Sequence, residues 1–594
     1  MSERIWSSAS STDLNDSANY SGSGALLTTD DLVFDSTSIV NATASANLDV
    51  NSITVASNYS GNMTFINRTA IYENGNASFD GTGTLHLGSG ITLNGASAIL
   101  HIGSGVGTVT ASPCVVTMNG TTGMTIDDDK SVLFKSLVLG ANAIVTNSGS
   151  ITTTYTGTST LLTFVNGGTL TINTQINLRA TADCSVISIT GSPTINGTSI
   201  LEIHGRNSGV VSTLPAITMT GTTTLNIAGR VTTASTSHTI TLSGNISAPT
   251  INIMNNTANG FVFDQGMYTI TSSGVLSIGN SSTGSTVLNF NGNITSGSIN
   301  GSTYNGATTV NLGASLISCN GNFTFGSNHT ITPETSTVTI TNTSNITSNG
   351  KLFYDLVIDA SGKTITLINA LSCHSITKTS GTITGNFSIT FSGNASFSVS
   401  TTLYRLIRTS GVTGTITIEA GATLTLSNLT NTDLNGVAGA LTQWKSSSSG
   451  TQFNLIIPDE IILIYQNPQD CNSSDIITVD DGTSVDGGNN VNWIFPDVTD
   501  DKILIIENLN QIINVNQYID VSRNVIFKNF ENENVNVQSV LLNSSGFICF
   551  YGIGYNEVDA KRVYLCAGKI HRIGGIHCFL SSDTDKGIGI HVIV

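Results

Sequence analysis

Large aliphatic residues alternate with Thr, Asn or Ser in short runs along most of the chain. This alternation places aliphatic side chains on one face and small polar side chains on the other, which predicts strands with one buried face. Gly, Asn and Ser separate the runs, as turns require. No amphipathic helix is predicted in residues 1–495. Clear examples of the runs are residues 168–172, 223–227, 238–242, 364–367, 414–418 and 422–426.

Strands this short bury little surface individually, so we expect them to stack in coils that share one apolar interior. Each coil winds in the same direction as the one before, and neighbouring strands should therefore pair in parallel. The repeat is too irregular to give a coil length. The positions expected to point inward are Leu170, Ile172, Leu225, Ile227, Ile240, Leu242, Ile365, Leu367, Ile416, Ile418, Leu424 and Leu426.

One stretch is written almost twice, because residues 85–90 (LHLGSG) return as residues 100–105 (LHIGSG). The repeat places His86 and His101 at matching positions. We expect these histidines to occupy equivalent outward positions on successive strands and not to form a metal or catalytic site. The displacement of 15 residues is short for a full coil, so the repeat could instead link different faces.

Composition narrows the possible partners. Of 594 residues only 10% are charged, 39% are hydrophobic, and the formal charge is −17, which disfavours nucleic acid. No apolar run is long enough to span a membrane, and the start, MSERIWSSASSTDLN, contains no conventional secretory signal. The first five cysteines are widely spaced, so we expect buried reduced thiols instead of a disulfide framework; they are Cys114, Cys184, Cys319, Cys373 and Cys471.

The composition changes at Pro496. Residues 1–495 contain 27 acidic, 13 basic and 52 Gly residues, whereas residues 496–594 contain 11 acidic, 8 basic and 8 Gly. The second segment still reads as strands, which predicts a smaller C-terminal β-domain. Its last strand, residues 588–594, is apolar and should be paired, either within the domain or with a neighbouring copy.

Segments at both ends of the first region carry a resemblance. The start contains Trp6, the pair Asn19-Tyr20 and the run Asp30–Asp35; the end, residues 442–495, contains SSSGTQF and GGNNVNW motifs; residues 353–367 lie between. These motifs resemble β-helical modules of bacteriophage structural proteins and bacterial surface proteins. The resemblance implies a cap at residues 1–38, a parallel β-helix over 39–495, and a C-terminal β-domain over 496–594 for attachment or oligomerisation.

The resemblance also implies a class of function. Such modules serve as spacers, adhesins and virion parts, and the bacterial surface forms usually carry a signal peptide. We therefore expect a phage virion surface protein: a head fibre, decoration protein or non-enzymatic tail fibre that binds host glycans. By analogy it would be a homotrimer that contacts other virion proteins through residues 496–594. The alternatives are a bacterial extracellular adhesin or filament subunit and, more remotely, a polysaccharide-depolymerising tailspike.

Catalysis is not expected. Glycoside cleavage needs two carboxylates in a cleft, and the first 495 residues contain only six Glu: Glu3, Glu73, Glu202, Glu334, Glu419 and Glu460. Glu202 and Glu419 lie in predicted strands, and each could pair with an Asp of an adjacent coil. Aromatic platforms for sugars are scarce, because Trp6, Trp444 and Trp493 all lie near the ends. Neither a phosphate-binding Gly-rich loop nor a particular Ser-His-Asp set is identified.

Acidic and Cys/His clusters raise the question of metal binding. None of the acidic runs matches a calcium loop, so we expect solvated turn carboxylates. The C-terminal group has two Cys and two His, the ligand types of a zinc site, but their spacing matches no known zinc motif. We therefore expect a buried thiol beside exposed histidines and no cofactor. The groups are Asp30, Asp31 and Asp35; Asp127, Asp128 and Asp129; Asp480, Asp481 and Asp486; Asp583 and Asp585; and Cys566, His571, His577 and Cys578.

Overall fold

The computed structural model of the chain is nearly all β, with a parallel β-solenoid of about 17 turns over residues 31–491. The described residues contain no α-helix and one 3₁₀ turn, Ser17–Asn19. Beyond residue 495 eight short strands are described. Before it, the description omits residues 1, 9–10, 23, 97, 111–113, 120–122, 127–130, 141–142, 148–149, 156–159, 166, 181–183, 206–210, 230–236, 257, 259, 303–305, 480 and 482.

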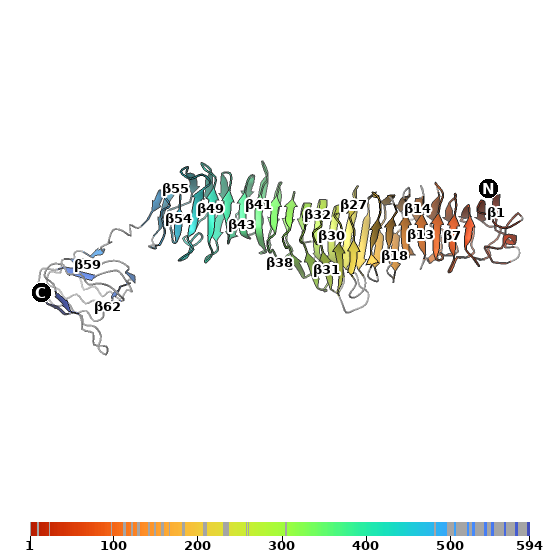
Figure 1. Cartoon of the computed structure of the whole chain (residues 1–594), viewed down its shortest axis with the longest axis horizontal. Helices are drawn as coiled ribbons and strands as arrows, with labels where there is room; N and C mark the ends of the chain where they lie inside the picture. Colours follow the sequence, from red (N-terminus) through yellow and green to blue (C-terminus); the bar gives the residue numbers. More distant parts are fainter. Residues whose placement is uncertain are drawn as a thin grey trace. The chain divides into compact units, whose positions relative to one another are not determined.

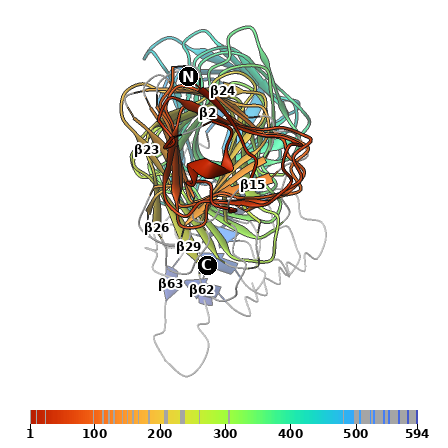
Figure 2. The ribbon, with the colours of Figure 1, turned by 90° about the vertical axis from the view of Figure 1, so that its right-hand side faces the viewer.

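In the first coils three short strands follow one another, and each belongs to a different sheet. The coils stack along the solenoid (Figure 1). In one such coil β7 (Thr69–Tyr72), β8 (Ala77–Phe79) and β9 (Thr84–His86) follow one another, and β10 (Gly90–Leu93) starts the next coil in parallel with β7. Viewed from the end that holds β1, the successive coils lie over one another (Figure 2). In the solenoid, every strand pair whose register is described is parallel, as predicted.

Three sheets cover the first coils. Within each sheet, hydrogen-bonded strands come from successive coils, so most neighbouring strands are not consecutive along the chain. Besides β7 to β10, these sheets contain β1 (Ser2–Ile5), β2 (Asp30–Phe34), β5 (Ser52–Val55), β11 (Ile99–Ile102) and β14 (Gly123–Ile126); β4 (Leu48–Val50), β13 (Val115–Met118), β16 (Ser136–Leu139), β19 (Leu162–Phe164) and β23 (Ile187–Ile189); and β3 (Ala42–Thr43), β6 (Met63–Thr64) and β12 (Thr108–Thr110).

Later coils share one 23-stranded sheet, which runs from β15 (Ser131–Phe134) to β54 (Gln466–Pro468). A seven-stranded sheet and a six-stranded sheet cover other faces. The seven-stranded sheet contains β22 (Cys184–Ser185), β26 (Val211–Leu214), β29 (His238–Leu242), β31 (Phe261–Asp264), β33 (Thr286–Asn289), β35 (Thr308–Asn311) and β38 (His329–Thr332); the six-stranded sheet contains β47 (Thr401–Leu403), β50 (Thr423–Leu426), β52 (Phe453–Ile456), β53 (Ile461–Leu463), β55 (Cys471–Val479) and β56 (Val491–Ile494).

The interior is a continuous column of aliphatic and aromatic side chains. All twelve positions that the alternation predicts to point inward are at most 4% exposed, which confirms that prediction. Burying a large aliphatic side chain contributes about 1.5–3 kcal/mol, so the repeated inward pairs supply most of the cohesion between the coils. The strands are short, and each coil therefore depends on its neighbours.

Asparagine side chains complete the hydrogen bonding at the corners between strands. Asn62 Oδ1 accepts the backbone N–H of Thr84 at 2.9 Å, and Asn394 Oδ1 accepts that of Thr415 at 3.0 Å, in each case about one coil further along the chain. The side-chain oxygen replaces a ladder carbonyl where the backbone turns away. The same contact recurs from Asn41, Asn47, Asn76, Asn245, Asn291 and Asn322.

The prediction that His86 and His101 lie at equivalent positions on successive strands is wrong. His86 ends β9, which pairs with β6 and β12, whereas His101 lies in β11, which pairs with β8 and β14. The two histidines are therefore on different faces of the solenoid. The reason is coil length: Gly90 pairs with Thr69 and with Val115, offsets well above 15 residues. Both side chains are partly exposed.

The chain divides into two compact units: residues 1–478 with 483–493, and residues 479–482 with 494–594. In the second unit β57 (Leu504–Ile506), β59 (Val525–Lys528) and β61 (Ile548–Tyr551) pair in parallel, as do β58 (Asp520–Val521), β60 (Val540–Leu542) and β62 (Val563–Leu565). The last strand, β64 (His591–Ile593), pairs antiparallel with β63 (His577–Phe579). The terminal strand is thus paired within its own unit, one of the two arrangements predicted.

Two neighbouring glycines test how tightly the coils approach. A Cβ on Gly88 would overlap the carbonyl oxygens of Phe65 and Arg68, whereas a Cβ on Gly90 would lie 3.4 Å from the Val115 oxygen, an ordinary contact. We expect Gly88→Ala to destabilise the first coils by about 2 kcal/mol or more and Gly90→Ala to change stability by less than about 0.5 kcal/mol. Hydrogen exchange of residues 60–95 checks this, and equal effects of the two variants would contradict it.

Candidate functional site

The N-terminal residues that resemble those of β-helical modules form a cap over the first coil. Trp6 is fully buried, with its ring centroid 5.2 Å from that of Tyr20 and 5.3 Å from that of Phe34. Phe34 in turn lies 5.5 Å from Tyr59 of the next coil. The Trp6–Tyr20 and Phe34–Tyr59 pairs are edge-to-face, a geometry that adds to the stability gained from burial alone. These aromatic residues therefore close the end of the interior.

Asp30, Asp31 and Asp35 each have a separate structural role. Asp30 is buried and its Oδ2 lies 3.2 Å from Nε of Arg4. Burial opposes the charge of Asp30, but hydrogen bonds from Ser2 and Leu27 and the positive charge of Arg4 outweigh it and lower the pKa of the carboxyl. The other two accept ordinary hydrogen bonds: Asp31 Oδ1 from Asn51 and Ser52, and Asp35 Oδ1 from the N–H of Thr37.

The resembling residues at the other end bind the last coils together. Asp470 Oδ2 accepts the N–H of Gly450 at 3.0 Å and its Oδ1 accepts Nδ2 of Asn489 at 2.7 Å. Trp444 is fully buried and donates through Nε1 to Gln466 Oε1 at 2.9 Å. These contacts join three segments of the closing motif across coils. The motif residues thus form a second cap.

Other predicted acidic and Cys/His groups are only partly within the described structure. Asp486 accepts Nδ2 of Asn490 at 2.6 Å and the N–H of Gly488 at 2.9 Å, so it stabilises a turn. Asp481 is half-buried and has interactions of its own. The backbone of His577 and Cys578 lies in β63. The residues outside the described structure are Asp127, Asp128, Asp129, Asp480, Asp583, Asp585, Cys566 and His571.

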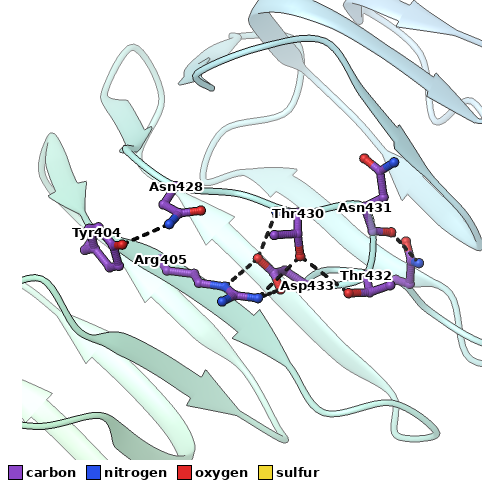
Figure 3. Close-up of polar contacts among 8 residues, drawn as sticks. Tyr404, Arg405, Asn428, Thr430, Asn431, Thr432 and Asp433 are labelled. Carbon is purple, nitrogen blue, oxygen red and sulfur yellow. Dashed lines mark hydrogen bonds and ion pairs between the residues drawn. The ribbon is translucent and has the colours of Figure 1, made fainter.

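A polar excursion leaves the solenoid between β50 and β51 (Thr442–Ser446), at residues 427–441 (Figure 3). Its centre is Asp433, which is 3% exposed and receives both nitrogens of the Arg405 fork, Nη2 at 2.6 Å and Nε at 2.8 Å. Thr430 adds its N–H to Asp433 Oδ2 at 3.0 Å. A bidentate pair of this kind fixes both position and orientation. The excursion is therefore held as an ordered lobe.

Burial and hydrogen bonding set the charge state of this lobe. Burial opposes ionisation of Asp433, but the hydrogen bonds from Arg405 and Thr430 and the charge of Arg405 lower its pKa below the usual range. A second arginine, Arg408, is 3% exposed, and its guanidinium donates to the carbonyls of Val412 and Asn435. The backbone N–H of Arg408 donates to the Asp433 carbonyl at 2.7 Å. The lobe thus lies on the free edge of β48 (Arg405–Arg408) in place of another strand.

The predicted acidic strand residues occupy different environments. Glu202, in β25 (Ile200–Gly205), is 8% exposed; its Oε1 lies 3.0 Å from Nε2 of His204 and its Oε2 accepts from Gln175. Glu419 is exposed directly after β49 (Gly414–Ile418). The described contacts of the Glu202 side chain are therefore with an imidazole and an amide group.

A carboxylate pair that the sequence analysis missed lies on the surface of the first coils. Asp49, in β4, hydrogen-bonds to Glu73, which follows β7 on the next coil. Burial, followed by the charge of Glu73 and this shared hydrogen bond, raises the pKa of Asp49. Asn94 donates to Glu73 Oε2 at 3.1 Å. Only the coil length, which the sequence does not show, brings these residues together.

Three titratable side chains point into the apolar interior. His238 and His329 are at most 1% exposed, and burial lowers the pKa of each to about 4. Lys378, at the end of β43 (Leu371–Lys378), is also 1% exposed, and its register partners are Ile358 and Phe397. Burial lowers the pKa of Lys378, and its Nζ has no hydrogen-bond partner. These groups are departures from an otherwise apolar core.

The described cysteines behave as core residues. Cys114, Cys319, Cys373 and Cys471 are buried and free, as predicted, while only the backbone of Cys184 is described. Burial raises the pKa of the Cys114 thiol to about 12. Within the described ranges, no group of three or more His, Cys, Asp or Glu side chains is arranged to hold a metal ion. In the same part of the chain, no helix is long and apolar enough to cross a membrane.

Comparison with known proteins adds no relative. No protein-family model, curated protein or solved structure matches the chain.

The lobe should depend on its ion pair. Arg405→Ala leaves the buried Asp433 without its guanidinium partner, and we expect a loss of about 2 kcal/mol. Because the Arg405 pair lowers the pKa of Asp433, its contribution is present above the unfolded pKa near 3.8 and lost as the pH falls through the folded pKa. Urea unfolding of both proteins over this pH range checks the result. Arg405→Ala combined with Asp433→Asn should lose less than Arg405→Ala alone; an equal or larger loss would argue against the pair.

Replacing the buried lysine should stabilise the solenoid. Lys378→Met removes an ammonium group without a partner and keeps the length of the side chain, so the melting temperature should rise by on the order of 2 °C. Because burial lowers the pKa of Lys378, its cost is greatest below the lowered pKa of the folded state and shrinks as the pH rises from there towards the unfolded pKa of 10.5. Lys445→Met, at an exposed position of β51, is the matched control. A lower melting temperature for Lys378→Met would refute this account.

Proposed function

We propose that this chain is a structural, non-enzymatic protein of a bacteriophage virion surface: a head fibre, a decoration protein or a tail fibre. The observation that carries the proposal is a solenoid of about 17 turns with side-chain networks at its first and last coils. With about 4.8 Å between coils, such a stack extends roughly 80 Å. A rod of this kind separates an attachment point from whatever it binds.

The outer surface supports a binding role toward neutral ligands. On β42 (Thr364–Leu367) and β44 (Thr382–Thr384), register-matched threonines point outward, and the hydroxyls of Thr366 and Thr384 lie 3.1 Å apart. Such ladders present hydroxyl groups without charge. Host surface glycans, which are rich in hydroxyl groups, are the partner class that fits, whereas a net charge of −17 disfavours nucleic acid.

Attachment is assigned to residues 496–594, where the charged fraction rises and Gly becomes scarce. In this proposal residues 496–594 hold three copies of the chain together as a homotrimer and contact other virion proteins. The protein resides on the virion surface without membrane insertion. The trimer is an analogy with phage fibres. The alternative is a bacterial extracellular adhesin or filament subunit, which would use the same rod on a cell surface.

A depolymerising tailspike is less well supported. Polysaccharide cleavage uses two carboxyl groups separated by about 5–10 Å, with the sugar between them. Asp49 and Glu73 hydrogen-bond directly to each other, so they leave no such gap. The pair is better explained as a contact between adjacent coils.

Truncation after Phe495 tests the assignment of the two units. We expect the shortened protein to keep its β-solenoid circular dichroism spectrum, because the solenoid has its own core and caps. It should sediment as a monomer and fail to incorporate into phage particles, since the proposed attachment unit is gone. A shortened protein that keeps the full-length oligomeric state and still incorporates would overturn the assignment.

A further inference from the structure

Two histidines occupy the same interior column several coils apart. In the seven-stranded sheet, parallel pairing aligns His238 with Phe261, Thr286, Thr308 and finally His329. All five side chains are at most 3% exposed. This column of aligned, buried side chains therefore has an imidazole at each of its two ends, His238 on β29 and His329 on β38.

Among the described residues, none accepts a proton added to His238. Neither Nδ1 nor Nε2 has a hydrogen-bond partner, and the ring lies against Phe261 with centroids 5.2 Å apart. A Cβ placed on Gly229 would be 2.9 Å from Cε1 of His238, so the backbone is packed against the ring. Protonation would leave two N–H donors and a full charge in this closed space, which is costly.

His329 is held in one tautomer by the backbone. Its Nδ1 accepts the N–H of Gly326 at 3.3 Å, so the ring proton is on Nε2, which has no partner. A second proton on Nδ1 would set one N–H against another and break that hydrogen bond. A Cβ on Gly301 or on Gly326 would be 2.6 Å from the ring, so little space remains for it to turn.

The charged surroundings do not compensate. Apart from burial, the group that lowers the pKa of His238 is His204, and the one that lowers the pKa of His329 is Lys351. The carboxylate described in this network is that of Glu202, whose Oε1 lies 3.0 Å from Nε2 of His204. Both lowered pKa values mean that the unfolded state binds more protons, so stability is lost as the pH falls from about 6.5 towards about 4.

We propose that the coils from β29 to β38 form an acid-sensitive section of the solenoid, which opens on protonation of His238 and His329 while the flanking coils stay closed. This role goes beyond that of a rigid spacer. A solenoid suits it, because each coil contacts only its neighbours and can open without unfolding the rest. In this column the two imidazoles lie on β29 and β38, the first and last strands of the section that opens.

Hydrogen exchange of the full chain at about pH 7 and pH 4.5, corrected for intrinsic exchange rates, tests the proposal. Strands β29 and β38 should lose protection by on the order of 100-fold in acid, while β49 and β52, whose interiors hold no histidine, should change little. This comparison requires no variant. Equal loss along the whole solenoid, or no loss at β29 and β38, would overturn the proposal.

Two substitutions then assign the effect to the rings. His238→Phe continues the aromatic column of Phe261, and His329→Asn keeps an acceptor for the Gly326 N–H without a titratable group. The double variant should lose less than 10-fold of its protection in acid, and His101→Gln, on the solenoid surface, should behave like the unaltered protein. If the double variant opens in acid as the unaltered protein does, the histidines are not the cause.

Discussion

The backbone of each coil can satisfy its hydrogen bonds only on the coils before and after it. A helix pairs its own N–H and C=O groups, but a strand in a solenoid has none within itself. Every turn must therefore return the chain to the same register, with small residues where backbones approach closely, as at Gly88. Where a corner removes a carbonyl from the ladder, an Asn side chain such as Asn62 or Asn394 supplies the missing acceptor.

The same constraint explains where the charged and aromatic residues gather. The first and last coils each lack one neighbour, and an uncovered edge would pair with other chains. Aromatic packing around Trp6 and the Arg4–Asp30 ion pair close one end, and the hydrogen bonds of Asp470 close the other. The lobe around Asp433 is an internal version of the same arrangement, because it covers the edge of β48. These charged residues therefore lie where a strand edge would otherwise be uncovered.

The alternation of side chains was sufficient to predict the strands, the parallel stacking and the inward residues, because a period of two depends only on the strand itself. Contacts between coils were not predictable, because the coil offset varies from Ser388–Arg405 to Thr423–Asn454. Turns absorb the difference, so a fifteen-residue repeat led to the wrong pairing of two histidines. The inward position of His238 was predictable in the same way, because it is in phase with Ile240 and Leu242.

The tolerance of polar groups in the core follows from the one-dimensional stacking. In a compact domain an ammonium group as buried as that of Lys378 would weaken the whole cooperative unit. In a solenoid the cost falls on one coil and its two neighbours, because stability is a sum of local and nearest-neighbour contributions. A long rod can therefore hold weak sections without losing its ends. A section weakened by histidine differs from one weakened by lysine only in the pH at which the weakness appears, and for the buried histidines that pH lies on the acid side of neutrality.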